Sequence, residues 1–361
     1  MIERAVGTLW HDDGIAARAG RTVLTPLSWL YAAGATYLGE RQARHASAPP
    51  IPVLSVGNVS VGGTGKTPVT AWTAARLQSL GAAPAIVMRG FGDDEPQVHA
   101  TLNPEVPVII DADRVRGVAA ALRSGADCVV LDDAFQHRRI RRLADWVLVS
   151  AEQWRPDARV LPAGPLREPL GALRRADAVI ITRKCADMAR AERCASDLAG
   201  IVGAERVATI HLQLGALETL DGSARSDLLL LNGKRVLAVA AVGDPQAFFA
   251  QLRGRGLDVV EAPFADHHAF TRADAARLAR MSRDCVAAVC TLKDAVKLAS
   301  LWAPAATPLW YVSQQLVVER GGKLLDHWLE AVLAERPGAS STAGSAGTSN
   351  LRHGHRPSIA D

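Results

Sequence analysis

Short apolar runs alternate with longer, more polar segments over the first 200 residues of the chain. The runs lie at residues 51–56, 84–88, 107–111, 127–133, 146–149 and 178–182. Each is about as long as a buried strand, and segments such as 114–124 between them are typical of helices. Strands that alternate with helices predict an α/β fold built on a mostly parallel sheet.

The pattern changes after residue 206. Residues 207–221 alternate apolar and polar side chains, which predicts an antiparallel β-ribbon. Further apolar runs, at 236–241, 257–261, 286–290 and 309–312, predict a second and smaller α/β unit. We therefore expect a core at 46–206, a β-ribbon connection at 207–224 and a second α/β domain at 225–336. Residues 337–361, rich in Gly, Ser, Thr and Ala, are expected to be a disordered tail.

The first apolar run leads into a glycine-rich loop, SVGGTGKT, followed by a helix-like segment. A strand, a glycine loop, a Lys-Thr pair and a helix form the layout of a phosphate-binding P-loop. The strict pattern has glycine where Ser60 stands, so the loop is a modified P-loop; a glycine-rich turn with an exposed lysine is the alternative. Lys66 is expected to reach the β- and γ-phosphates, and the Thr67 hydroxyl to bind Mg²⁺. The predicted nucleotide-binding residues here are Ser60, Val61, Gly62, Gly63, Thr64, Gly65, Lys66 and Thr67.

A second motif ends the apolar run DCVVLDD at residues 127–133. Carboxylates at the carboxyl end of a parallel strand face the edge of the sheet where α/β folds bind ligands. Asp132 and Asp133 are therefore expected to hold Mg²⁺, and Gln136 to orient a nucleotide or a water molecule. Together the two motifs predict a nucleoside triphosphate and Mg²⁺ as ligands, but they do not say what receives the phosphate.

Residues Thr22–Gly39 carry no charged side chain. Eighteen uncharged residues are near the minimum for a membrane span, but Pro26 and Gly34 dilute the apolar character. Trp29 and Tyr31 are residue types that favour a membrane–water interface. We predict that residues 1–45 form a helical segment lying in the membrane interface; a buried core helix and a spanning helix remain as alternatives.

Composition narrows the class of protein. Lys and Arg number 41 against 37 Asp and Glu, which is too balanced to predict a nucleic-acid partner. The five cysteines form no C-x-x-C pair, so we expect reduced thiols in a cytosolic setting and no zinc site. Acidic residues precede any apolar run at the N-terminus, so no signal peptide is expected.

Several segments, in chain order, carry a family resemblance. They are SVGNVSVGGTGKTP, LDDAFQHRR, LPAGPLREP, AVGDPQAFF, FADHHAF and TLKDAVKL. From about Pro26 to Leu333 the chain resembles the tetraacyldisaccharide 4'-kinases, the lipid A biosynthetic kinases of Gram-negative bacteria. The resemblance implies a P-loop kinase core joined by a β-ribbon to a second α/β domain. It also implies ATP, Mg²⁺, a tetraacyldisaccharide 1-phosphate acceptor and peripheral attachment to the cytoplasmic face of the inner membrane; a monomer is expected.

The resemblance also assigns residues beyond the two phosphate-site motifs. It implies that Asp94 is the catalytic base, that His267 pairs with it, and that Arg167 and Glu168 lie in a loop near the phosphates and the acceptor. Without the resemblance, Asp94 would be taken for an exposed loop carboxylate. Lys66 completes the expected catalytic set.

The chain departs from the family pattern at several positions. Asp93 replaces the glycine before Asp94, and the segment from Arg89 to Asp94 is contracted, so Asp93 is a rival for the base. Ala134 replaces a glycine after the aspartate pair. Leu292 replaces a glutamate, which implies weaker contacts at the nucleotide or at a helix terminus.

Two other functions share parts of this pattern. A nucleotide-switch protein, such as a GTP-dependent metal chaperone, would use the same P-loop and aspartates. It would also need a guanine-reading motif, which TLKD resembles only weakly, and metal-binding His or Cys runs, which do not occur before the tail. A small-metabolite kinase acting in solution would have no use for the uncharged Thr22–Gly39 segment.

Overall fold

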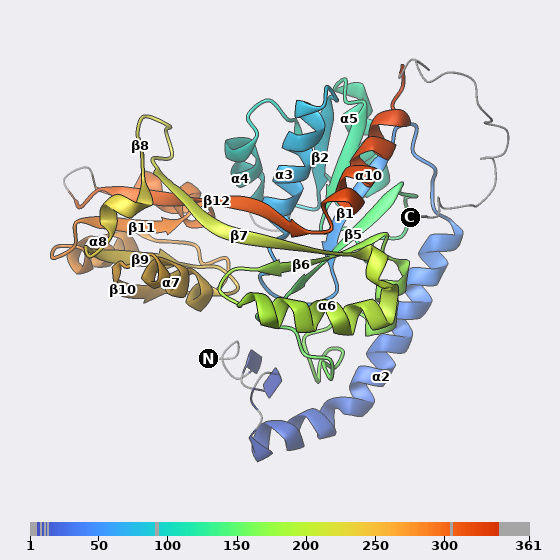
Figure 1. Ribbon diagram of the computed structural model, residues 1–361, viewed down its shortest axis with the longest axis horizontal. Helices are drawn as coiled ribbons and strands as arrows, with labels where there is room; N and C mark the ends of the chain where they lie inside the picture. The colour runs from blue at the N-terminus through green and yellow to red at the C-terminus, as the bar shows by residue number, and fades with distance from the viewer. Residues whose placement is uncertain are drawn as a thin grey trace.

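A computed structural model describes residues 6–7, 9–10, 12, 14–90, 94–303 and 306–338. In this part of the chain twelve strands form one sheet, in the order β10-β9-β11-β12-β7-β6-β5-β1-β4-β2-β3, with β8 beside β7 (Figure 1). Only the β7–β12 and β7–β8 pairs are antiparallel among the strand pairs of these residues. The predicted α/β class with a mostly parallel sheet is confirmed. The predicted tail lies outside the described residues except for 337–338, and Asp93 lies outside them as well.

The elements alternate along the chain much as the apolar runs predict. The strands are β1 (Val53–Asn58), β2 (Pro84–Met88), β3 (Val108–Ile110), β4 (Cys128–Asp132), β5 (Ala144–Ser150), β6 (Ala178–Arg183), β7 (Val207–Glu218), β8 (Arg225–Ser226), β9 (Arg235–Ala240), β10 (Asp258–Pro263), β11 (Ala287–Thr291) and β12 (Leu309–Arg320). The α-helices are α2 (Ile15–Arg44), α3 (Lys66–Ser79), α4 (Asp94–Leu102), α5 (Arg114–Arg123), α6 (Met188–Val202), α7 (Pro245–Gly254), α8 (Arg272–Met281), α9 (Leu292–Leu298) and α10 (Gly322–Ala334).

Helices cover both faces of the sheet in its first half, β1 to β6. Neighbouring residues of β4 point to opposite sides: Val130 joins a cluster with α3 and α10, and Val129 joins a cluster with α5. The side chains of α6 fill a further cluster against β5 and β6. Because both faces are buried, these strands read in the sequence as continuous apolar runs.

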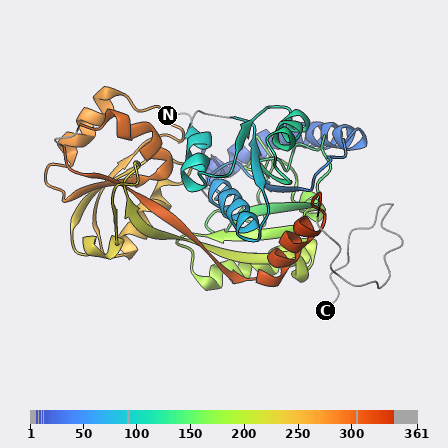
Figure 2. The same ribbon diagram turned by 90° about the horizontal axis from the view of Figure 1, so that it is seen from above.

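A long two-stranded ribbon connects the two halves of the molecule. Strands β7 and β12 pair antiparallel, and Figures 1 and 2 both show them side by side between the two lobes. After β12 the chain returns to the first half, where Leu329 of α10 packs in the same cluster as Leu77 of α3. The sequence-based boundary at 225–336 therefore needs correction, because α10 belongs to the core of the first half.

Helix α2 lies on the outside of the first half (Figure 1). Only Ala17 and Ser28 are buried among its described residues, so the alternative of a buried core helix is wrong. The Ser28 hydroxyl donates to the Val160 carbonyl at 2.8 Å and accepts from the Ala163 N–H at 3.0 Å, which fixes the helix to the loop before Arg167. Among the described residues, no helix is both long and apolar enough to cross a membrane.

Candidate active site

A cleft of about 1060 Å³ opens at the carboxyl ends of β1 and β4, where α/β sheets usually bind ligands. The first half of the molecule lines it with the glycine-rich loop, Asp132, Asp133 and Arg167. The second half contributes the loops after β9 and β10 and the start of α9. The two halves therefore build the walls of a single cleft.

The glycine-rich loop is held in a fixed shape. Gly65 has a φ of +85°, and a Cβ there would lie 2.4 Å from Cδ1 of Leu212, so only glycine fits. The Thr64 hydroxyl accepts a 3.0 Å hydrogen bond from Asn58, and the Thr64 carbonyl accepts one of 2.9 Å from Thr182. Ser60, the residue that breaks the strict pattern, forms a β-bridge with Leu166. A loop that already has its bound shape loses little conformational entropy when the ligand binds.

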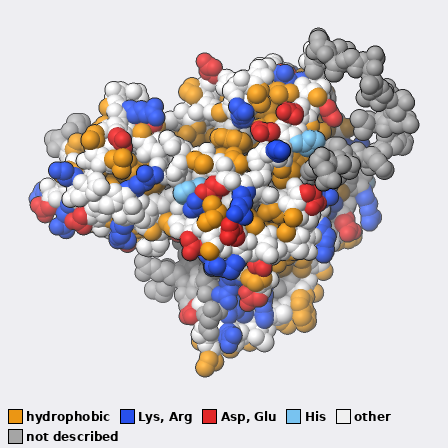
Figure 3. Space-filling model, viewed as in Figure 1, with side chains coloured by type: hydrophobic (Ala, Val, Ile, Leu, Met, Phe, Trp, Pro, Cys, Tyr) orange, Lys and Arg blue, Asp and Glu red, His pale blue; other side chains and the backbone are white. Residues whose placement is uncertain are grey.

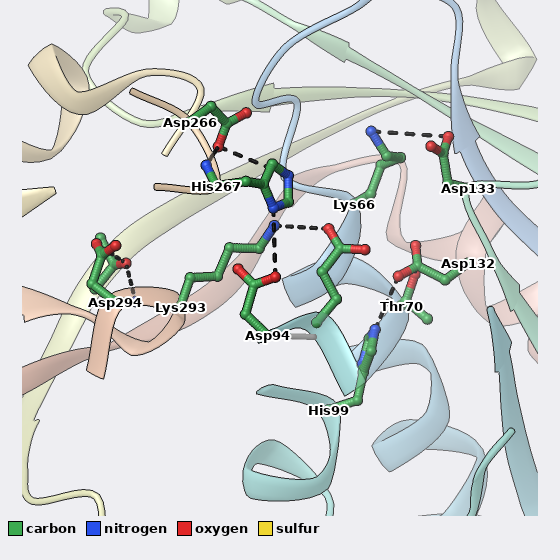
Figure 4. Close-up of polar contacts among 12 residues, drawn as sticks. Lys66, Thr70, Asp94, His99, Asp132, Asp133, Asp266, His267, Lys293 and Asp294 are labelled. Carbon is green, nitrogen blue, oxygen red and sulfur yellow. Dashed lines mark hydrogen bonds and ion pairs between the residues drawn. The ribbon is translucent and has the colours of Figure 1, made fainter. Parts of the chain in front are cut away.

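Lys66 begins α3 and points into the cleft (Figure 4). Its side chain is only 17% exposed, so the alternative of a merely exposed lysine does not hold. Burial lowers the pKa of the Lys66 ammonium below its usual range, although Asp133, whose Oδ1 lies 3.9 Å from Nζ, opposes this shift. Anionic phosphate oxygens in the cleft would compensate the charge that burial disfavours.

Asp132 and Asp133 follow one another at the end of β4 but have different surroundings (Figure 4). The buried Asp132 carboxylate accepts from Thr70 at 3.2 Å and contacts His99 Nε2 at 2.9 Å. Burial raises the pKa of the Asp132 carboxyl, but the contacts with His99, Lys66 and Thr70 prevail and leave it below its usual value. Arg167 Nη1 lies 3.0 and 3.1 Å from the two Asp133 oxygens.

The donor chemistry of this site fits Mg²⁺. Thr67, Asp132 and Asp133 line the cleft and offer hydroxyl and carboxylate oxygens, the hard ligands that Mg²⁺ prefers. Within the described ranges, no group of three His, Cys, Asp or Glu side chains could hold a metal by itself. This agrees with the usual habit of Mg²⁺ in kinases, where a few protein oxygens are completed by water and phosphate oxygens.

Of the other site residues predicted in the first half of the chain, some line the cleft and one does not. Gln136 lines the cleft, and its amide donates to the Asn58 carbonyl at 2.9 Å. Arg167 also lines the cleft, but the neighbouring Glu168 does not: its buried carboxylate pairs with Arg175 at 3.0 Å. The geometry thus brings Arg167 to the site, whereas Glu168 fixes the loop from behind.

The structure also brings Asp94 and His267 together from opposite halves (Figure 4). His267 Nδ1 lies 3.5 Å from Asp94 Oδ1. Asp94 is 5% exposed and begins α4, so its interpretation as an exposed loop carboxylate is wrong. His267 lines the cleft with its backbone in the left-handed region, at φ 57°, which is uncommon for a residue other than glycine.

Two lysines of α9 pair with the acidic start of α4 on this side of the cleft, and the sequence did not identify them. Lys293 Nζ lies 2.8 Å from Glu95 Oε1, and Lys297 Nζ lies 3.6 Å from Asp94 Oδ2. Burial raises the pKa of the Asp94 carboxyl, but Lys297, Lys293 and His267 outweigh burial and lower it. Asp94 is therefore ionised at neutral pH and able to accept a proton. The two lysines stand four residues apart on one helical face, and this spacing was the available signal.

Comparison with known proteins places this geometry in a family. Residues 20–334 match the family model described as Tetraacyldisaccharide-1-P 4'-kinase. The tetraacyldisaccharide 4'-kinase of Halorhodospira halophila is 38% identical over 335 residues, covering 86% of this chain and 92% of that protein. The corresponding protein of Aromatoleum aromaticum is 37% identical over 322 residues, covering 83% and 90%. The chain belongs to the tetraacyldisaccharide 4'-kinase family.

A solved structure of the family has the same fold. The "apo" form of LpxK from Aquifex aeolicus, in complex with ATP, has a TM-score of 0.65 at 25% sequence identity, covering 86% of this chain and 99% of that one. Membership makes the protein a phosphotransferase and decides against the nucleotide-switch alternative.

Two departures of this kinase from the family pattern lie in packed positions. Ala134 is fully buried directly after Asp133, whose own backbone is left-handed at φ 49°. Leu292 is buried at the start of α9 in an apolar cluster with Ala295 and Leu298. Weaker contacts at Leu292 remain a prediction.

Replacing Lys297 by methionine should change the pH dependence of the kinase. The ammonium lowers the pKa of Asp94, so its loss should raise that pKa and move the acidic limb of kcat/KM to higher pH. The pH–rate profile measures this shift, with Lys323→Met on the exposed surface of α10 as the control. An unmoved acidic limb would show that Asp94 does not determine it.

Proposed function

We propose that this kinase transfers the γ-phosphate of ATP to the 4'-hydroxyl of a tetraacyldisaccharide 1-phosphate lipid at the cytoplasmic surface of the inner membrane. One observation carries the proposal: the phosphate cradle of the first half and His267 of the second half line the same cleft, and His267 contacts the Asp94 carboxylate. The ATP bound by the Aquifex aeolicus relative supports the identity of the nucleotide.

Phosphoryl transfer requires positioning and charge compensation more than covalent chemistry. The N–H groups of the glycine-rich loop and the Lys66 ammonium would hold the triphosphate. Thr67, Asp132 and Asp133 would hold Mg²⁺, which supplies positive charge to the β- and γ-phosphate oxygens. The Arg167 guanidinium, which contacts the Asp133 carboxylate, lies where it can bind a phosphate oxygen in place of that carboxylate.

The proton of the sugar hydroxyl requires an acceptor. His267 is the member of the pair that lines the cleft, and Asp94 lies directly behind it. We assign the proton to the pair as a unit: the hydroxyl proton leaves toward His267 and Asp94 while the oxygen bonds to the γ-phosphorus, and the bond from that phosphorus to the β–γ bridging oxygen breaks to release ADP. Because the members come from different halves, their contact depends on how the two halves are placed relative to one another.

The acceptor lipid implies a membrane-facing surface, and α2 has the properties of one. Its exposed side chains include Trp29, Leu30 and Tyr37, and Arg41 and Arg44 occupy its last turn. Figure 3 shows hydrophobic and basic side chains beside one another at the lower right of this face, where Figure 1 draws α2. A helix of this kind can lie in the lipid headgroup region with its basic residues near anionic lipids.

Replacing Trp29 and Leu30 by serine should weaken binding to vesicles of phosphatidylethanolamine and phosphatidylglycerol. Both side chains are about 70% exposed, so the fold loses little, while roughly 1.5–3 kcal/mol of transfer energy is lost for each side chain fully buried in lipid. Vesicle cosedimentation measures the loss. Leu230→Ser, at an equally exposed site in the second half, is the matched control. Unchanged cosedimentation would place membrane attachment elsewhere.

The function itself is tested by transfer of labelled γ-phosphate from ATP. The expected product is the 4'-phosphorylated disaccharide lipid, formed only with Mg²⁺, and a soluble disaccharide should accept phosphate poorly. Equal transfer to the soluble sugar would contradict a lipid acceptor. Transfer from GTP but not ATP would contradict the nucleotide assignment.

A further inference from the structure

His99 is a buried histidine that none of the roles above uses. It lies on α4 with no exposed surface, and its Nε2 is 2.9 Å from Asp132 Oδ2 (Figure 4). Its other ring nitrogen, Nδ1, is buried without a hydrogen-bond partner among the described residues. The Asp132 carboxylate is the partner of Nε2. Without it both ring nitrogens would be buried without a hydrogen-bond partner, which is unfavourable.

Two contacts hold the Asp132 carboxylate in place, one to each of its oxygens. Thr70 donates to Oδ1 at 3.2 Å and His99 contacts Oδ2, so both oxygens are oriented from the side of the protein core. A carboxylate oxygen has two lone-pair directions, and each donor occupies one. This is the arrangement by which outer contacts orient the ligands of a metal.

His99 also connects two parts of the site through α4. The helix begins at Asp94, and its second turn carries His99, about 7.5 Å farther along the axis at 1.5 Å per residue. Lys293 and Lys297 pair with the first turn, and Asp132 with the second. One short helix therefore places the proton-accepting carboxylate and the donor to the metal-site carboxylate in a fixed relation.

We propose that His99 is a positioning residue: its Nε2–H orients the Asp132 carboxylate toward Mg²⁺ and fixes α4 against the nucleotide side of the cleft. This inference rests on the proposed role of Asp132 at the Mg²⁺ site. A histidine that merely filled the core would leave the response of nucleotide binding to Mg²⁺ unchanged when replaced.

The test uses the full chain and a fluorescent ATP analogue, titrated in EDTA and at increasing Mg²⁺. In His99→Leu the Mg²⁺ concentration that gives half of the affinity gain should rise roughly 10–100-fold, as for other contacts behind metal ligands. Affinity in EDTA should stay unchanged, since His99 does not touch the phosphate cradle. Thr70→Val, which removes the other donor, should shift the Mg²⁺ response in the same direction.

Matched variants separate positioning from packing. His99→Gln carries an amide N–H near the place of Nε2 and should recover most of the Mg²⁺ response, whereas His99→Asn is one methylene too short and should not. This pair decides the matter even if His99→Leu does not fold. Thr73→Val is the control for Thr70, because its buried hydroxyl donates to the Val69 carbonyl of its own helix.

The outcomes distinguish this inference from the proposed function. If nucleotide binding by the natural chain does not respond to Mg²⁺, the metal site itself is wrong. If the natural chain responds and His99→Leu or His99→Asn responds equally, only the positioning role is overturned. Equal losses in His99→Gln and His99→Asn, in EDTA as well as in Mg²⁺, would assign His99 to packing alone.

Discussion

Replacing Lys66 by alanine should lower phosphoryl transfer by roughly 10²–10³-fold, the usual effect of losing one preorganised electrostatic contact. The ammonium lies beside Asp133 at the start of α3, so its loss removes one positive charge from the γ-phosphate site while Arg167 keeps its own place on Asp133. Asp133→Ala should also lose most of the activity, because it removes an oxygen ligand for Mg²⁺. Initial rates at saturating Mg²⁺-ATP and lipid measure both effects.

Lys234→Ala is the control, since its side chain is exposed in the second half of the chain, far from the phosphate loop in sequence. Thermal unfolding of each variant separates loss of charge from loss of fold; removal of a buried ammonium is not expected to lower the stability of the protein. Near-normal turnover by Lys66→Ala would contradict the P-loop interpretation.

Alanine at Asp94 or at His267 should each lower kcat by roughly 10²–10⁴-fold, the usual contribution of general acid–base catalysis. The double variant should cost little more than the worse single variant, because residues that act as a unit fail non-additively. ATP affinity should barely change, since neither side chain belongs to the phosphate cradle. A complete double-mutant cycle in kcat measures the coupling.

His268→Ala is a close control for His267. Its ring packs on Phe264 and Phe270 and pairs with Asp274 at 3.2 Å, outside the residues that line the cleft. Asp93→Ala belongs in the same experiment, because Asp93 is the rival for the base. Small and additive losses from Asp94 and His267 would remove the pair from the mechanism, and a collapse with Asp93→Ala alone would move the base by one residue.

The parts of the site that the sequence predicted are those encoded locally. The glycine-rich loop and the Asp132–Asp133 pair each follow an apolar strand, so a few neighbouring residues suffice to place them at one edge of the sheet. The side chains of Asp94 and His267 lie in contact, as the family resemblance implied. Local sequence pattern alone predicts neither residue, because they lie 173 positions apart and their contact depends on how the second half folds over the first.

Other parts depend on tertiary context. The acidic run before Pro96 reads as a loop, yet α4 begins at Asp94, since proline and acidic residues are both tolerated in the first turn of a helix. In the sequence His99 looks like any histidine on a half-buried helix, and its contact with Asp132 is visible only in the folded structure. The return of the chain through β12 was missed because only its first residues, Leu309–Val312, form an apolar run, whereas the remainder, SQQLVVER, is mostly polar and is half-buried or exposed.

The antiparallel ribbon makes the second lobe an insertion in the topology of the first half. The chain leaves the first half on β7 and returns on β12, and Glu218 and Tyr311 are direct partners across the two strands. The segment between them is entered and left at adjacent points, so the lobe stands where a hairpin would have its turn. An insertion of this kind leaves the host fold intact, because the two ends of the inserted segment lie close together.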